Sequence, residues 1–188
     1  QATMILEKAI WSKPTKKWKF PKNCRVREVA VNIGTNLGNR RENLRFALNK
    51  IAEFAGTLRT SKIYETEAWG YTSCNPFYNI GAVFKSDLSA EDLYDKFHQI
   101  ELLSGCQTHR DGSGNYIDRL LDIDIIYVGN EVIDGELSIP HPRLYQRSFV
   151  VLPLAELTPE WVDPRTNMRI SDILESLDKS DVIGVYDL

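Results

Sequence analysis

The sequence predicts an α+β fold, an antiparallel sheet with flanking helices, and two observations carry that prediction. Hydrophobic residues recur at every second position in some segments and at every third or fourth position in others, so strands and helices alternate along the chain. The segments follow the order strand, helix, strand, strand, helix, strand, before a longer mixed segment. That order is typical of a ferredoxin-like sandwich.

The first strand and the first helix precede Gly56. Hydrophobic residues alternate through residues 29–33, as in a strand with one face toward a core. Asn39, with Glu42 three residues later, has the pattern of a capping box, and Gly56 is typical of a helix end. The apolar stripe between them consists of Leu44, Leu48, Ile51 and Ala55. These positions recur at helical spacing and predict one buried helix face.

Two more strands and a second helix follow. Residues 57–65 and 77–86 have strand character, and the loop between them is rich in turn-forming residues, which predicts a functional loop. Ser89, with Asp92 three residues later, predicts the start of the second helix, which ends near Gly105. Its predicted core face consists of Leu93, Phe97, Ile100 and Leu103.

The last strand of the predicted order, residues 118–127, carries two carboxylates on one face. Because side chains alternate along a strand, Asp122 and Asp124 point to one side and the aliphatic residues beside them to the other. Two like charges this close repel each other, and one or two divalent cations would compensate them, since hard cations prefer oxygen ligands. With Arg119, such a site suits phosphoryl transfer. A bare pair of aspartates at this spacing is more often the solvent face of an ordinary strand. The motifs elsewhere in the sequence therefore distinguish a metal site from an exposed strand face.

Composition and charge narrow the class of protein. With 188 residues, 43% hydrophobic and 26% charged, the chain suits one compact soluble domain, and no apolar run approaches the ~20 residues of a membrane helix. A formal net charge of -3 predicts no global attraction to nucleic acid, so an anion site needs a local basic cluster such as Arg119, Arg143 and Arg147. The 3 widely spaced cysteines fit neither a disulfide framework nor a zinc site, which predicts a cytoplasmic protein.

Residues 1–27 are predicted to be an extension, and residues 28–188 the main domain. Over residues 11–25, lysines are interleaved with aromatic side chains, a pattern found in segments that bind nucleic acid or acidic membranes. A surface arm that packs its aromatic side chains on the domain or on a neighbouring subunit explains the pattern better. The excess of lysine over arginine, with Pro14 and Pro21, argues against a mitochondrial presequence.

A series of short motifs occurs in one order at residues 29–38, 64–70, 77–79, 100–101, 119–124, 140–143 and 147–149. Together they resemble the 6-hydroxymethyl-7,8-dihydropterin pyrophosphokinases, folate-pathway enzymes that move pyrophosphate from ATP to a pterin alcohol. The resemblance covers roughly residues 28–178 and implies that residues 28–188 form a pyrophosphokinase domain with the ferredoxin-like fold.

The resemblance implies a role for the paired carboxylates. Asp122 and Asp124 would hold two Mg²⁺ ions that bridge the phosphates of ATP, and Arg119 would contact phosphate oxygens as the third catalytic residue. The hydroxymethyl oxygen of the pterin would attack the β-phosphorus, giving the pterin diphosphate and AMP. The alternative for Arg119 is an ion pair with a neighbouring aspartate such as Asp118.

The resemblance also implies which residues bind the two substrates. Those implied for the pterin are Thr66, Glu67, Trp69, Phe77, Asn79 and Phe149. Phe77 and Phe149 would sandwich the ring, Asn79 would read its hydrogen-bonding edge, and Trp69 would act as a mobile lid. Those implied for the nucleotide are Glu101, Arg110, Tyr116, Arg119, Ile125, His141 and Arg147. The family's arginines soon after the second helix are missing here, and Arg110 is the expected replacement.

Two other classes of protein stay open on the sequence alone. A two-metal hydrolase or nucleotidyl transferase would use the same aspartates, but it gives no reason for Phe77, Asn79 and Phe149. A ferredoxin-like binding module without catalysis would explain the missing arginines but not the intact aspartate pair. The family occurs both as standalone enzymes and within multifunctional folate-pathway polypeptides, and a monomer or weak dimer is expected.

Overall fold

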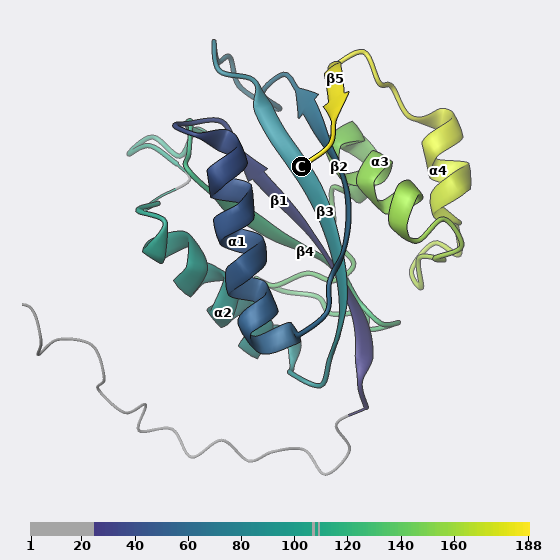
Figure 1. Ribbon diagram of the computed structural model, residues 1–188. Helices are drawn as coiled ribbons and strands as arrows, with labels where there is room; N and C mark the ends of the chain where they lie inside the picture. Colours follow the sequence, from purple (N-terminus) through teal and green to yellow (C-terminus); the bar gives the residue numbers. More distant parts are fainter. Residues whose placement is uncertain (1–24, 107, 109) are drawn as a thin grey trace, which may run out of the picture.

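The computed structural model describes residues 25–106, 108 and 110–188 (Figure 1). Its strands are β1 (Arg27–Thr35), β2 (Arg59–Thr66), β3 (Phe77–Ser86), β4 (Asp122–Val128) and β5 (Val182–Tyr186). Its helices are α1 (Arg40–Ala55), α2 (Ala90–Leu103), α3 (Ser148–Leu157) and α4 (Ile170–Ser176), with a 3-10 turn, η1 (Leu144–Gln146), before α3. The strands form one antiparallel sheet in the order β4-β1-β3-β2-β5, and the predicted ferredoxin-like arrangement is confirmed.

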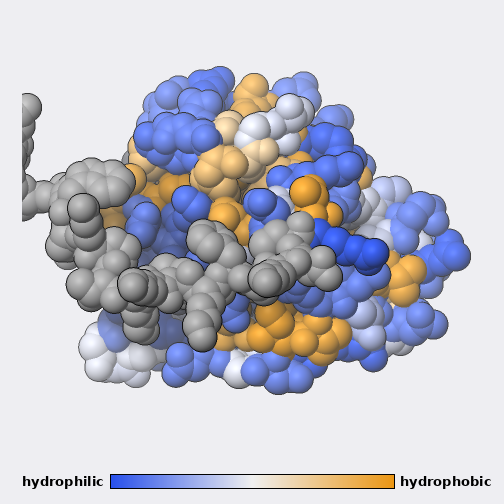
Figure 2. Space-filling model, turned by 90° about the horizontal axis from the view of Figure 1, so that it is seen from below, coloured by the Kyte–Doolittle hydropathy of each residue, from blue (hydrophilic) through white to orange (hydrophobic). Residues whose placement is uncertain are grey.

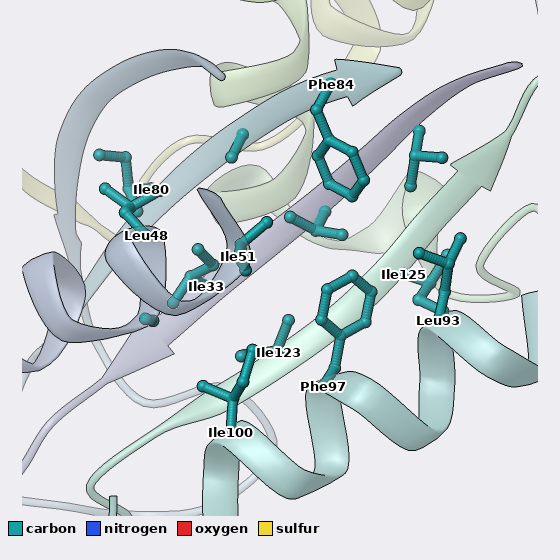
Figure 3. Close-up of a cluster of buried hydrophobic side chains, with 14 of the residues drawn as sticks. Ile33, Leu48, Ile51, Ile80, Phe84, Leu93, Phe97, Ile100, Ile123 and Ile125 are labelled. Carbon is teal, nitrogen blue, oxygen red and sulfur yellow. The ribbon is translucent and has the colours of Figure 1, made fainter. Parts of the chain in front are cut away.

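Helices cover both faces of the sheet, α1 and α2 on one side and α3 and α4 on the other (Figure 1). Two hydrophobic cores result. The first lies under α1 and α2, where Phe97 and Leu48 meet the isoleucines of β1, β3 and β4 (Figure 3). The second, smaller core lies between the sheet and α3 with α4, and Tyr127 and Leu154 are buried in it. The alternation of side chains along each strand therefore supplies both layers.

The predicted helix starts are correct. Asn39 Oδ1 accepts a hydrogen bond from the Glu42 amide at 3.3 Å, and Ser89 Oγ accepts one from the Asp92 amide at 3.0 Å. These bonds satisfy amide groups that have no partner inside the first turn. Gly56 follows α1 with a positive φ of 73°, a conformation that glycine adopts without strain.

The predicted core face of α2 is wrong at Leu103, whose side chain is 68% exposed. Leu93, Phe97 and Ile100 are buried as expected. At 100° per residue, Leu103 lies roughly 90° around the helix from the middle of that stripe. The last turn instead buries Glu101, which faces β4.

The longer mixed segment at the end of the chain contains a strand that the sequence did not predict. β5 pairs with β2 in antiparallel register and extends the sheet by one strand beside residues 63–66. The Glu67 amide continues this pairing by donating to the Asp181 carbonyl at 3.0 Å. The end of β2, where the predicted pterin residue Thr66 lies, is therefore held on both sides.

The predicted extension, residues 1–27, lies outside the described residues except for its last three, and β1 already begins at Arg27. The face of the molecule in Figure 2 is mostly hydrophilic, with its hydrophobic side chains in separate patches. Within the described part of the chain, each helix is too short or too polar to traverse a bilayer. Of the cysteines, Cys74 is exposed and Cys106 is buried, and both are thiols.

Candidate active site

One end of one sheet face collects polar side chains from neighbouring strands. The register pairs Thr66 of β2 with Phe77 of β3, and Asn79 of β3 with Gly34 of β1. Gly34 in turn pairs with Asp122 of β4. Because side chains two residues apart share a face, these positions line up across the sheet. Further along the same face α3 packs on β2 and β3, and Phe149, its second residue, borders the polar end.

A pocket opens at this end of the sheet. It is lined by Asn32, Gly34, Thr66, Glu67, Trp69, Tyr71, Phe77, Asn79, Tyr116, Arg119, Asp122, Arg147 and Phe149. All the residues predicted to bind the pterin are among them. The free space inside is about 30 Å³, so the slot is narrow, and Trp69 is one of the side chains that border it.

Sequence reasoning missed Asn32, Gly34 and Tyr71 as lining residues. Asn32 pairs with Asp124 across β1 and β4 and is 5% exposed. Its Oδ1 has no hydrogen-bond partner among the described residues. The sequence did contain a sign of this role. Asn32 and Gly34 alternate with the hydrophobic residues of the first strand, so they had to lie on its opposite face.

The floor of the pocket holds a fixed amide. Asn79 is 3% exposed, and its Nδ2 donates to Thr66 Oγ1 at 3.1 Å. Asn79 Oδ1 lies near Gly34, where a Cβ atom would approach it to 3.1 Å. The absence of a side chain at Gly34 thus leaves room beside an amide that has both a donor and an acceptor.

Two phenylalanines also border the pocket, each beside an arginine. The guanidinium carbon of Arg119 lies 5.3 Å from the ring centroid of Phe77, and that of Arg147 lies 5.5 Å from the centroid of Phe149. Arg147 also lies 4.9 Å from the ring centroid of Trp69. Cations at this distance are attracted to aromatic faces, so the arginines and rings form one continuous surface.

Each aspartate of the pair has an arginine as its counterion. Arg119 Nη2 lies 2.7 Å from Asp122 Oδ2, and Arg147 Nη1 lies 2.8 Å from Asp124 Oδ2. Arg119 thus forms an ion pair with a neighbouring aspartate, as in the alternative from the sequence, but the partner is Asp122 and not the suggested Asp118. Arg119 Nε and Nη1 and Arg147 Nε are buried without a hydrogen-bond partner among the described residues. Buried N–H donors without a partner are costly, and these donors suit a phosphate ligand.

The donor set fits Mg²⁺ that arrives with phosphates. Asp122 and Asp124 offer hard oxygen ligands from one strand face. Among the residues that the structure describes, there is no cluster of three or more potential ligands from His, Cys, Asp and Glu. Mg²⁺ typically uses one or two carboxylates and completes its shell with water and substrate phosphates. Two carboxylates are therefore sufficient protein ligands for that ion.

A second pocket adjoins the first on the side of β4 and the loops. It is lined by Arg110, Tyr116, Arg119, Asp122, Asp124, His141, Pro142, Arg143 and Arg147. With four arginines against two aspartates, its lining is basic. The predicted local basic cluster is confirmed as a group of neighbours in space, in a chain whose net charge is -3. Such a pocket attracts a polyanion.

His141 lies in this basic pocket as a neutral imidazole. Its Nδ1 accepts a hydrogen bond from the Arg143 amide at 3.1 Å, so that nitrogen carries no proton. Burial lowers the pKa of His141, and the charges of Arg147 and Arg143 act in the same direction against the opposing Asp124. The Nε2 of His141 lies 3.4 Å from Arg147 Nη1, so the imidazole sits directly beside a guanidinium group of the pocket.

The loop between α2 and β4 brings Arg110 to the second pocket. The guanidinium carbon of Arg110 lies 4.1 Å from the ring centroid of Tyr116, and Nη1 donates to the Gly114 carbonyl at 2.7 Å. The predicted substitute for the missing arginines is thus near the other basic residues. Tyr116 borders both pockets and also contacts Arg143 through its hydroxyl.

Glu101 and Ile125 lie apart from the other predicted nucleotide residues. Glu101 borders a third pocket, between α2 and β4, with Asp122 and Asp124. Its Oε1 accepts from the Ile123 amide at 2.7 Å, and burial, with the two aspartates, raises the pKa of Glu101 to about 8. Ile125 packs its side chain into the core under α1 and α2 (Figure 3) and is not among the described residues that line the second pocket.

The fold and the site together define a phosphoryl-transfer enzyme with an arginine-rich anion pocket beside a flat slot. The chain belongs to the family described as 7,8-dihydro-6-hydroxymethylpterin-pyrophosphokinase, which matches residues 30–159. A "2-amino-4-hydroxy-6-hydroxymethyldihydropteridine pyrophosphokinase" of Porphyromonas gingivalis is 39% identical over 139 residues, 72% of this chain and 93% of that relative. One of the same name from Synechocystis is 34% identical over 169 residues, 88% of this chain and 83% of the relative.

Some relatives are much longer proteins. The "Folic acid synthesis protein FOL1" of Dictyostelium discoideum is 33% identical over 138 residues, which are 72% of this chain but 20% of the relative. The crystal structure of wild-type Plasmodium falciparum HPPK-DHPS matches 80% of this chain with a TM-score of 0.63 and 16% identity. The match covers 44% of that solved chain, and the likeness shows the fold.

Proposed function

We propose that this protein transfers the pyrophosphoryl group of ATP to the hydroxymethyl oxygen of 6-hydroxymethyl-7,8-dihydropterin and releases AMP, as a step in folate synthesis. The names of the relatives support the substrate pair. One observation in the structure carries the proposal: the slot with the fixed Asn79 amide and the basic pocket share Arg119, Asp122 and Arg147 as a common wall. A ring in one pocket and a polyphosphate in the other would meet there.

The slot would orient the pterin. Phe77 and Phe149 offer ring faces for stacking, and the Asn79 amide offers a donor and an acceptor to the pyrimidine-like edge. Thr66 Oγ1 accepts from Asn79 Nδ2 and thereby fixes how the amide is turned. A ring held on its faces and along one edge would direct its hydroxymethyl group toward the shared wall.

The basic pocket would hold the triphosphate. Arg119, Arg147 and Arg143 supply fixed planar donors, and His141 lies among them. When two Mg²⁺ ions are bound at Asp122 and Asp124, they draw charge from the phosphate oxygens. The arginines would then stabilise the charge that develops as the pterin oxygen bonds to the β-phosphorus and the bond to the α-phosphate oxygen breaks.

The test is AMP formation from ATP and Mg²⁺, with and without the pterin. We expect pterin-dependent AMP and an equal amount of pterin diphosphate, and EDTA should stop both. ADP in place of AMP would mean transfer of a single phosphoryl group, and pyrophosphate release would mean a nucleotidyl transferase. Absence of all three products, with ATP binding intact, would identify a binding module.

A further inference from the structure

One carboxylate outside the lining of the site joins three segments of the chain. Asp118 Oδ1 accepts hydrogen bonds from Asn36 Nδ2 at 2.7 Å and from the Tyr71 hydroxyl at 3.0 Å. Asp118 Oδ2 accepts one from Asn75 Nδ2 at 2.6 Å. The donors come from the turn after β1 and from the loop between β2 and β3. A single side chain thus ties that loop to the segment that leads into β4.

The bonds to this carboxylate are charge-assisted. Burial raises the pKa of Asp118, but hydrogen bonds from Ser73, Asn75, Asn36 and Tyr71 together outweigh it and lower the pKa below its usual value. Burial and Asp118 raise the pKa of Tyr71 to about 12, so its hydroxyl remains a donor. Hydrogen bonds to an ionised acceptor are shorter and stronger than neutral ones. The network is therefore intact at neutral pH.

Asn36 connects the same network to the backbone of Arg119. Asn36 is 3% exposed. Its side-chain Oδ1 accepts a hydrogen bond from the backbone amide of Arg119 at 2.8 Å, and its backbone amide donates one to the Arg119 carbonyl at 3.2 Å. Asn36 Nδ2 also donates to the Asn75 carbonyl at 3.1 Å. The position of Arg119 and the position of the loop are thus fixed by one set of bonds.

The geometry points to Asp118 as a positioning residue that anchors the loop of residues 71–75 against Arg119 and so shapes the pterin slot. This role rests on the proposed function. Asp118 does not line any of the three pockets that the described residues form around the site, whereas its neighbours Tyr71 and Arg119 line the slot. The anchor acts through them.

The anchor also divides the loop into a held part and a movable part. Gly70, with a positive φ of 81°, separates Trp69 from the anchored Tyr71. Because glycine changes its backbone conformation without strain, Trp69 would be able to leave the slot while Tyr71 stays bound to Asp118. The predicted lid is then the short segment before Gly70, and the anchor is its fixed support.

The anchor should act mainly on the pterin, because the backbone of Arg119, which also lines the second pocket, is bound by Asn36 and not by Asp118 itself. Residues 67–76 contribute Glu67, Trp69 and Tyr71 to the slot, but none of them lines the second pocket as the described residues form it. Loss of the anchor therefore loosens the slot first. The expected signature is a rise in the KM for the pterin with a nearly constant KM for ATP.

The test compares Asp118→Ala and Asp118→Asn with wild type by hydrogen exchange of residues 67–76 in the free protein and by the two KM values. Asp118→Ala removes both acceptor oxygens of the side chain. Asp118→Asn keeps one oxygen but replaces the other with an amide nitrogen, which is itself a donor and faces another donor. We expect faster exchange in both variants, and at least about a tenfold rise in the KM for the pterin for Ala. The KM for ATP should change less than about twofold.

Asp178→Ala is the matched control, because Asp178 also accepts bonds from a backbone amide and a hydroxyl, those of Ser180, away from the pockets. It should leave both KM values and the exchange of residues 67–76 unchanged. Unchanged exchange in the folded Asp118 variants, or equal rises in both KM values, would overturn the positioning role. If wild type forms no pterin-dependent AMP, the proposed function fails, while the exchange experiment still decides whether Asp118 anchors the loop.

Discussion

The two halves of the site are built from different material. The strand-borne half, which consists of Asn32, Gly34, Thr66, Phe77 and Asn79, lies on three paired strands in a fixed register. The loop-borne half, which consists of Arg110, Tyr116, His141, Arg143 and Arg147, lies on the segments between α2 and β4 and between β4 and α3. Asp122 and Asp124 lie on β4, between the two halves.

Because of this difference, one half of the site selects a ligand by its shape and the other by its charge. The strand-borne half is buried and holds its amide through one hydrogen bond between side chains, so it suits a rigid ring of one shape. The loop-borne half is largely guanidinium groups, some of them exposed, which attract any polyphosphate of suitable length. The first half should therefore control selectivity for the acceptor, and the second the affinity for the donor.

The largest effect is expected at the border between the halves. Asp124→Asn keeps an oxygen for Arg147 but removes a negative charge that a bound cation needs. The transition state should then lose several kcal/mol of stabilisation, which lowers turnover by about 10³-fold. The melting temperature should stay close to that of wild type. AMP formation and thermal unfolding measure the two quantities, and near-normal turnover would remove the aspartate pair from the mechanism.

The next effect concerns stability and shows how the aspartate pair acts on its surroundings. Burial, with Asp122 and Asp124, raises the pKa of Glu101 from 4.5 to about 8, so the folded protein holds an extra proton between these pH values. Glu101 therefore contributes fully to the free energy of unfolding below the lower pKa, and this contribution is lost as the pH rises through the upper pKa.

Glu101→Gln should remove this pH dependence while keeping an acceptor for the Ile123 amide. Between pH 5 and pH 8, the free energy of unfolding of wild type should fall by a few kcal/mol relative to the variant. Denaturant unfolding at both pH values measures the difference. Parallel curves for the two proteins would mean that Glu101 titrates normally.

Gly34→Ala should sharpen the comparison by changing only the strand-borne half. A Cβ atom there would lie 3.1 Å from Asn79 Oδ1 and 3.6 Å from Phe77 Cδ1, so it fills the slot and displaces the amide. We expect about a tenfold rise in the KM for the pterin, since one misplaced hydrogen bond costs ~1 kcal/mol or more. The KM for ATP should not change; if it rose equally, the two halves would not be independent.

The smallest effect is expected from Arg110→Ala in the loop-borne half. Arg110 is exposed and stacks on Tyr116. An exposed charge contributes up to ~1 kcal/mol, so the KM for ATP should rise by about two- to fivefold and the KM for the pterin should stay constant. The effect should shrink as salt is added. A rise confined to the KM for the pterin would break the assignment of the halves.

The aspartate pair between the two halves was the most predictable part of the site. Alternation along residues 118–127 placed the two aspartates on one face, as the structure has them, because the period of a strand is a local property. Asn32 and Gly34 were missed because their place opposite the aspartates depends on strand register, which a single strand does not reveal. The family motifs, and not periodicity, pointed to Asn79.

The loop-borne half and the edge of the fold were less predictable. Loop residues have no period, so only resemblance suggested Arg110 and His141, and it gave no hint that Asp118 would bind the opposite loop. β5 was not predicted because Val182 and the residues after it form a short strand without a buried, alternating face. The prediction that Leu103 is buried was wrong because an apolar residue at the end of the helix was included in the apolar stripe, although it does not lie on that face.

The arginines that pair with Asp122 and Asp124 have a consequence for the order in which the site fills. A metal ion that arrives alone must compete with two cations tethered to the chain. A polyphosphate that arrives with it gives those guanidinium groups another anion, and the carboxylates then become available. If the ion and the nucleotide bind as proposed, their binding should be thermodynamically linked, and each should tighten the other by the same factor, which titration calorimetry can measure. The site should then bind the complex of metal and nucleotide more tightly than either partner alone.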